Sequence, residues 1–218
     1  MTHVTAPDVG SIPGAPSVRP RWLVGGARGA ALPDVLLACA LGTLLAGMAL
    51  PAAGGVRQRV RGESAARLLV AEFRQARVVA ARRSATVALR FEAADGRLSW
   101  RVFVDGDGDG VRSADVAEGT DRPITAVVRL DAEFPGVRAR IGRTVPSVDG
   151  AGRLAPGEDA LRLGAGDSLS FSPLGTASGG SLYLEGSNGA MYAVRVLGPT
   201  GRVRGLRFNP ATGRWDDL

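Results

Sequence analysis

An acidic residue, Asp34, stands at the start of a long apolar run, five residues after Gly29. The run from 35 to 56 has no charged residue, and as a helix it would extend about 33 Å, enough to cross a bilayer core of about 30 Å. A carboxylate at the edge of hydrocarbon normally has a partner or a function, because its burial is costly. Asp34 is therefore a candidate for charge pairing. The alternative is that it only caps the N-terminus of the helix.

A run of aspartates and glycines forms a second candidate site. Asp105, Asp107 and Asp109 are spaced like the acids at positions 1, 3 and 5 of an EF-hand loop, with a glycine at position 6. Position 12 is Val116, where a bidentate glutamate is expected, and a strand pattern leads into the loop, so a true EF-hand is not predicted. With Asp115 as a fourth ligand, the loop is a candidate for a weaker calcium site. The alternative is a hairpin loop with solvated acids.

Three arginines near the C-terminus, Arg202, Arg204 and Arg207, form a third candidate site. In a strand, Arg202 and Arg204 share one face, and two guanidinium groups on one face can bind a phosphate backbone. The three residues are therefore candidates for DNA binding. The alternative is an ordinary half-exposed strand, in which arginine and valine also alternate.

The rest of the composition narrows the possible functions. All 27 basic residues are arginine, and the net charge of +6 favours an anionic partner or surface. His3 is the only histidine and Cys39 the only cysteine, which excludes a histidine-dependent triad, a cysteine zinc site and an intrachain disulfide in the chain after its leader. No phosphate-binding loop is present. Neither catalysis nor a cofactor is expected, apart from calcium in the loop described above.

The pattern along the chain predicts four parts. Residues 1–29 are rich in proline and glycine and form a leader, residues 30–54 a transmembrane helix, residues 55–84 an amphipathic helix and residues 85–218 a β-rich domain. The amphipathic helix has one apolar stripe, formed by Leu69, Phe73, Ala76, Val79 and Ala80. We expect this stripe to pack on a sheet. The alternative is a helix lying on anionic lipid.

From residue 85 onward, apolar residues recur at every second position, which is the pattern of a β-strand. Residues 86–91 and 98–104 alternate around an Asp95-Gly96 turn, which predicts a hairpin. Further strands are expected at 124–130, 160–163, 168–171, 181–184, 191–197 and 203–208. The fold class is therefore α+β, with antiparallel strands packed against one long helix.

The order Gly29, Ala30, Leu32, Pro33, Asp34 resembles the start of a type IV prepilin. This resemblance implies that a prepilin peptidase cuts between Gly29 and Ala30, and that the new N-terminus is methylated. It also implies that Asp34 pairs with the Ala30 amine of a neighbouring subunit during assembly, which cancels two charges in an apolar setting. A cleaved secretory signal peptide and an uncut membrane anchor are the alternatives.

Four segments, 100–105, 170–175, 179–184 and 201–204, resemble in their order the GspH/FimT family of minor pseudopilins, and the resemblance covers about residues 28–208. It implies a type IV pilin-like fold and a structural subunit at the filament tip of a type II secretion system. It also implies a single-pass inner-membrane protein with a periplasmic C-terminal domain, whose partners are other pseudopilins or minor pilins.

Two other functions remain open. In FimT-like minor type IV pilins, a Gly-Arg-x-Arg tail is associated with DNA binding during natural transformation, and Arg202 and Arg204 match that tail. The second alternative is a membrane-anchored β domain unrelated to filaments, which predicts an uncut N-terminus.

Overall fold

The computed structural model describes the backbone of residues 32–218 and the side chains of residues 32–43 and 57–218. The chain divides into two compact units, Met1–Ala46 and Gly47–Leu218. The predicted leader, 1–29, lies outside the described residues, as do the first residues of the predicted transmembrane helix, 30–54. Among the residues that the structure describes, none of the helices has the length and apolar character needed for a membrane crossing.

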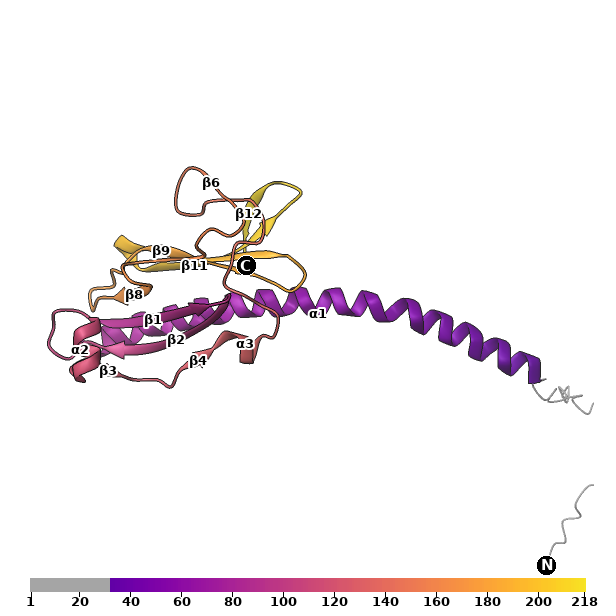
Figure 1. The fold of residues 1–218 in the computed structure, drawn as a ribbon, viewed down its shortest axis with the longest axis horizontal. Helices are drawn as coiled ribbons and strands as arrows, with labels where there is room; N and C mark the ends of the chain where they lie inside the picture. The colour runs from indigo at the N-terminus through magenta and orange to yellow at the C-terminus, as the bar shows by residue number, and fades with distance from the viewer. Residues whose placement is uncertain (1–31) are drawn as a thin grey trace, which may run out of the picture. The chain divides into compact units, whose positions relative to one another are not determined.

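A single long helix, α1, runs from Leu32 to Arg83 and contributes to both units (Figure 1). Pro33 in its first turn suits a helix start, because its missing N–H would have no intrahelical partner there. The helix ends where Ser84 adopts a positive φ of 50°, a conformation typical of the residue that follows a helix. The two predicted helical segments, 30–54 and 55–84, therefore belong to one continuous helix from Leu32 onward.

The larger unit contains two five-stranded antiparallel sheets (Figure 1). The first has the order β3 (Arg122–Pro123), β2 (Arg97–Val104), β1 (Val87–Ala94), β8 (Ser168–Phe171), with β4 (Val128–Arg129) also paired to β2. The second has the order β12 (Arg214–Asp217), β11 (Arg202–Asn209), β10 (Met191–Leu197), β9 (Gly180–Glu185), β7 (Leu161–Leu163). The smaller elements are β5 (Val145–Pro146) paired with β6 (Arg153–Leu154), the short helices α2 (Ser113–Glu118) and α3 (Leu130–Glu133), and the 3-10 turn η1 (Gly198–Thr200).

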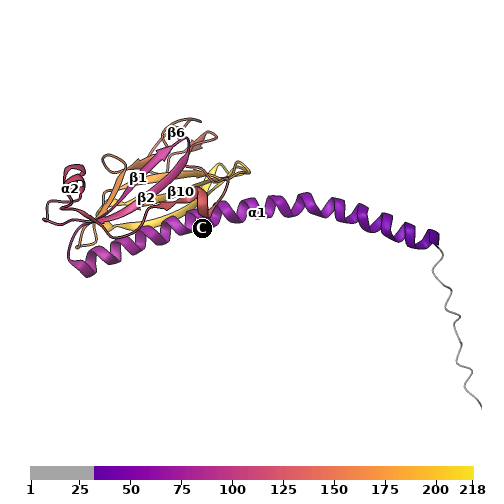
Figure 2. The same ribbon diagram turned by 60° about the horizontal axis from the view of Figure 1, so that its bottom comes forward.

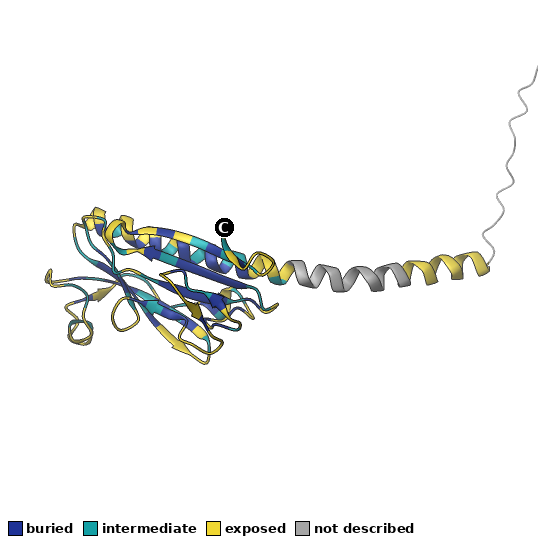
Figure 3. Ribbon diagram, turned by 90° about the horizontal axis from the view of Figure 1, so that it is seen from above, coloured by how far each residue is buried: buried dark blue, intermediate teal, exposed yellow. Residues whose placement is uncertain are grey.

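The second half of α1 packs along both sheets of this unit (Figure 2). Leu69 and Phe73 are fully buried, and Phe73 meets Phe91 of β1 edge to face with ring centroids 5.9 Å apart. The same apolar cluster includes Trp100 of β2 and Val194 of β10, so one core joins the helix to both sheets. Figure 3 shows buried residues on the helix and on the strands beside it. The expected packing of the amphipathic stripe on a sheet is confirmed.

A second apolar cluster covers the face of the second sheet that points away from α1. It is built from one side by Tyr183, Met191 and Phe208, and from the other by Ile141 and Val148 of the segment that precedes β7. Trp215 of β12 packs against it. The second sheet is therefore buried on both faces over part of its area.

The α+β class and most of the long strands agree with the predictions. The hairpin forms around Asp95 and Gly96, whose φ angles are both positive, and β10 has the predicted bounds. The predicted strand over 124–130 is wrong for most of its length, because only Val128 and Arg129 pair with β2 and Leu130 begins α3. Thr125 explains part of the difference, since its hydroxyl accepts the hydrogen bond of the Val102 N–H at 3.1 Å in place of a backbone carbonyl.

Candidate functional site

The first described turns of α1 carry an exposed apolar surface. Leu32 keeps 75% of its area exposed, Leu36 61% and Leu37 62%, and Val35 and Leu41 are exposed as well. Five large apolar side chains within ten residues of one helix form a patch of the kind that marks a protein or membrane contact. Asp34 lies in this segment, also exposed, in the first turn of the helix. The predicted cleavage site, Gly29 and Ala30, lies outside the described residues.

The loop after β2 is organised around Asp105, which is 7% exposed. Its carboxylate accepts backbone hydrogen bonds from Asp107 (3.2 Å), Gly108 (2.7 Å) and Gly110 (3.0 Å). Burial acts to raise the pKa of Asp105, but these N–H groups favour the charged form and lower its pKa below the ordinary value. Asp105 is therefore a carboxylate at neutral pH. Its Oδ1 accepts two of these hydrogen bonds and its Oδ2 one, so Oδ2 retains a lone pair for a further ligand.

Three of the four predicted calcium ligands come together. One carboxylate oxygen each from Asp105, Asp107 and Asp109 lies within 4.8 Å of the others, whereas Asp115, in α2, is outside that group. Asp115 nevertheless has a buried Oδ2 with no hydrogen-bond partner. The loop follows a strand, as predicted, and leads into the unpredicted helix α2.

The acidic loop is partly neutralised from within. Asp109 forms an ion pair with Arg112. Partial burial, Asp107 and Asp115 raise the pKa of Asp109, while Arg112 acts in the opposite direction. Arg112 therefore supplies part of the positive charge that the clustered acids attract.

Strand β11 separates the three predicted DNA-binding arginines. Arg202 and Arg204 are exposed on one face, as predicted, whereas Arg207 is half-buried on the opposite face, which it shares with Val203 of the core around α1. The three residues therefore do not form one surface. Arg195 of β10 lies directly opposite Arg204 and extends the first pair across the sheet.

Arg204 already has an acidic partner. Both oxygens of Asp217 in β12 accept hydrogen bonds from its guanidinium, at 2.8 Å. The hydrogen bond and the positive charge of Arg204 lower the pKa of Asp217, and the pairing raises that of Arg204. Arg195 also has an acidic partner, because its Nε lies 3.6 Å from Oδ1 of Asp149. The face that carries Arg195, Arg202 and Arg204 therefore has less unpaired positive charge than the sequence indicates.

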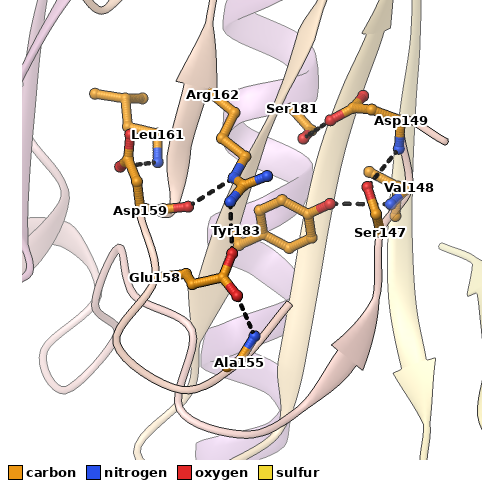
Figure 4. Close-up of polar contacts among 10 residues, drawn as sticks. All are labelled: Ser147, Val148, Asp149, Ala155, Glu158, Asp159, Leu161, Arg162, Ser181 and Tyr183. Carbon is orange, nitrogen blue, oxygen red and sulfur yellow. Dashed lines mark hydrogen bonds and ion pairs between the residues drawn. The ribbon is translucent and has the colours of Figure 1, made fainter. Parts of the chain in front are cut away.

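Polar contacts hold the segment before β7 on the second sheet (Figure 4). The hydroxyl of Tyr183 accepts a hydrogen bond from the Val148 N–H at 3.0 Å, and the Ser181 hydroxyl donates to Asp149. Tyr183 and Ser181 are both fully buried, so these contacts satisfy polar groups that water does not reach. The cluster is structural, because it consists of hydrogen bonds that fix a loop and an ion pair with Arg195.

Two acids with local roles were not predicted. Asp121 is fully buried and accepts hydrogen bonds from the Gly106 N–H (3.0 Å) and the Arg112 N–H (2.8 Å), so it closes the acidic loop. Asp217 neutralises Arg204. No spacing in the sequence connects either acid to its partner, since both contacts depend on the tertiary arrangement.

A family model described as type II transport protein GspH matches residues 65–201. The matched region includes the buried half of α1, both sheets except β11 and β12, and the acidic loop. No curated protein and no solved structure matches the chain.

Proposed function

Because this chain belongs to the GspH family of type II transport proteins, we propose that it is a minor pseudopilin at the filament tip of a type II secretion system. The family is structural, so the protein acts by position and contact and not by catalysis. We further propose that the helix start lies in the inner membrane and that the β-rich unit lies in the periplasm.

The exposed apolar start of α1 is the observation that carries this proposal. Leucine and valine side chains at 32, 35, 36, 37 and 41 have no covering partner within the described residues. A pseudopilin would bury such a surface in lipid before assembly and against neighbouring helices afterwards. Asp34, within the same surface, would pair with the Ala30 amine of the adjacent subunit.

Processing by a prepilin peptidase tests the proposal directly. Co-expression with the peptidase should give a chain that starts at Ala30, with a methylated amine, as measured by intact mass and N-terminal sequencing of the membrane extract. Gly29→Leu should abolish this cut, because the peptidase is expected to require a small residue there. The matched control Gly26→Leu should be cut normally. A mature chain that starts at Met1 or beyond residue 50 would contradict the pseudopilin proposal.

DNA binding remains a second candidate, supported by Arg202 and Arg204 on one face with Arg195 opposite. Arg202→Ala combined with Arg204→Ala should reduce the slope of log K against log salt by about 1.8, if each arginine contacts one phosphate. Asp217→Asn should tighten binding, because it frees Arg204. Arg122→Ala, exposed in β3 of the first sheet, is the control. Fluorescence anisotropy with duplex DNA measures these effects, and binding that is independent of salt would exclude DNA as the ligand.

We also propose that the acidic loop binds calcium weakly, because three carboxylates converge and Asp115 offers an unpartnered buried oxygen. Calcium at about 100 times its Kd should raise Tm by roughly 5–10 °C. Asp107→Asn should remove that shift, whereas Arg112→Ala should lower the calcium concentration needed, since Arg112 competes for Asp109. Glu118→Gln, exposed in α2, is the control. An unchanged Tm in calcium would show that the loop is only a hydrogen-bonded turn.

A further inference from the structure

Three arginines from three distant segments line one cleft of about 310 Å³ in the larger unit. Arg59 comes from α1, Arg143 from the segment before β5, and Arg207 from β11. The asparagines Asn188 and Asn209 line the same cleft with further hydrogen-bonding groups. We propose that this cleft binds the phosphate group of an anionic membrane lipid.

The lining of the cleft carries positive charge only, and Glu63, which also acts on Tyr192, is paired with Arg67. No acidic side chain is among its lining residues, and none of its three arginines forms an ion pair in the part of the chain that the structure describes. Arginines elsewhere in the unit do have acidic partners, such as Arg140 with Glu185 and Arg204 with Asp217. Three like charges facing one concave surface repel each other, so the site favours an anion that relieves the repulsion.

The floor of the cleft is rigid. Tyr192 of β10 is fully buried, and its hydroxyl donates a hydrogen bond to the carbonyl of Arg59 at 3.1 Å. Its ring lies against Gly62, where any side chain would collide with it. These contacts fix the turn of α1 that carries Arg59 against β10. Strand β10 in turn pairs with β11, which carries Arg207. The backbone segments that carry Arg59 and Arg207 are thus held side by side, and both residues line the cleft in the absence of any ligand.

The electrostatic effect of the arginines on Tyr192 supports their proximity. Burial and Glu63 raise the pKa of its hydroxyl, while Arg207 and Arg59 act to lower it. Both cations therefore lie close enough to influence the same atom.

Guanidinium groups bind phosphate through paired, charge-assisted hydrogen bonds, and a set of three suits a group with several free oxygens. The position along α1 indicates the source of that group. Arg59 follows the end of the predicted membrane segment, residue 54, by five residues, which is about 7.5 Å along a helix. This step rests on the proposed function, because only a chain anchored through that segment brings the cleft to the headgroup layer.

Lipid retention by the full chain tests the inference. The protein is reconstituted into nanodiscs that contain equal amounts of phosphatidylglycerol and phosphatidylcholine, and native mass spectrometry counts the lipids that remain bound. The wild type should retain phosphatidylglycerol preferentially. The triple variant Arg59→Gln, Arg143→Gln, Arg207→Gln should retain it at least about tenfold less, given the attraction expected for each basic residue near an anionic leaflet.

A matched triple variant separates the cleft from overall charge. Arg97→Gln, Arg122→Gln and Arg153→Gln remove the same number of charges from exposed positions outside the cleft, and should leave retention near the wild-type value. An equal loss in both variants would overturn the proposal in favour of general charge attraction. Thermal melts verify folding, and Arg207→Lys, which keeps the charge without the planar fork, should give an intermediate loss.

Further measurements identify the source of the phosphate. In zwitterionic detergent, calorimetry compares short-chain phosphatidylglycerol, short-chain phosphatidylcholine and inorganic phosphate, and the first should bind most tightly. Equal binding of inorganic phosphate would overturn the lipid assignment. So would a triple variant that retains lipid normally but loses association with a second subunit. A chain that is cut at Ala30 and retains no phosphatidylglycerol would refute this inference alone, whereas an uncut chain that retains it would refute the proposed function alone.

Discussion

Phe73→Ala is expected to lower the free energy of unfolding of the larger unit by about 3–5 kcal/mol. The ring is fully buried and lies in the cluster that joins α1 to both sheets, where it contacts Phe91. Its removal leaves a cavity at the junction of three elements, which cannot all move inward together. A domain is stable by only about 5–15 kcal/mol, so this change should remove a large share of the total.

Urea denaturation of the full chain in mild detergent, followed by tryptophan fluorescence, measures this loss, because Trp100 lies in the same cluster. Val78→Ala is the matched control on the same helix. Its side chain is 53% exposed, and its truncation should cost less than about 0.5 kcal/mol. Similar losses for the two variants would mean that the amphipathic half of α1 is not packed on the sheets in solution.

Local sequence signals were sufficient for the long elements. The hairpin of β1 and β2 follows from alternating apolar residues around Asp95 and Gly96, whose φ angles of 52° and 74° suit a two-residue turn that matches the strand twist. The stripe around Leu69 and Phe73 likewise marks the buried face of α1. In these segments the residues that determine the structure are neighbours in the sequence.

The short elements depend on distant residues and were missed. The β5–β6 pair is held on the second sheet by Trp215, whose Nε1 donates to the Pro146 carbonyl at 2.8 Å, and by Tyr183, which binds the Val148 N–H. Two-residue strands have no period of their own, so no local pattern predicts them. The same explanation holds for α2, whose six residues include no buried side chain.

In the candidate sites, too, neighbouring residues predict some features, whereas other features depend on contacts between distant residues. The shared face of Arg202 and Arg204 follows from strand alternation, but the neutralisation of Arg204 requires β12 to lie beside β11. The basic cleft was not predicted at all, because Arg59, Arg143 and Arg207 are separated by most of the larger unit in sequence. A sequence rich in arginine does not reveal which arginines remain free of acidic partners, and the free ones are those that determine binding.

Asp34→Asn is expected to reduce incorporation into filaments by about two orders of magnitude or more. In the proposed assembly, the Asp34 carboxylate pairs with the Ala30 amine of a neighbour in an apolar setting, and removal of one partner leaves a buried charge unpaired at a cost of about 3–5 kcal/mol. The fraction of the chain that co-sediments with sheared filaments measures incorporation. Cleavage at Ala30, followed by intact mass, should continue, so that assembly is distinguished from processing.

The size of the loss in Asp34→Asn distinguishes pairing between subunits from a local effect of Asp34 on its own helix. Asp34 lies in the first turn of α1, which begins at Leu32, so its charge also stabilises the helix through the dipole. That effect is worth only about 0.3–1 kcal/mol, which corresponds to a fewfold change at most. Asp34→Glu keeps the charge with a longer reach and should assemble like the wild type. If Asp34→Asn assembles within fivefold of the wild type, Asp34 acts only on its own helix, and another contact must hold the subunits together.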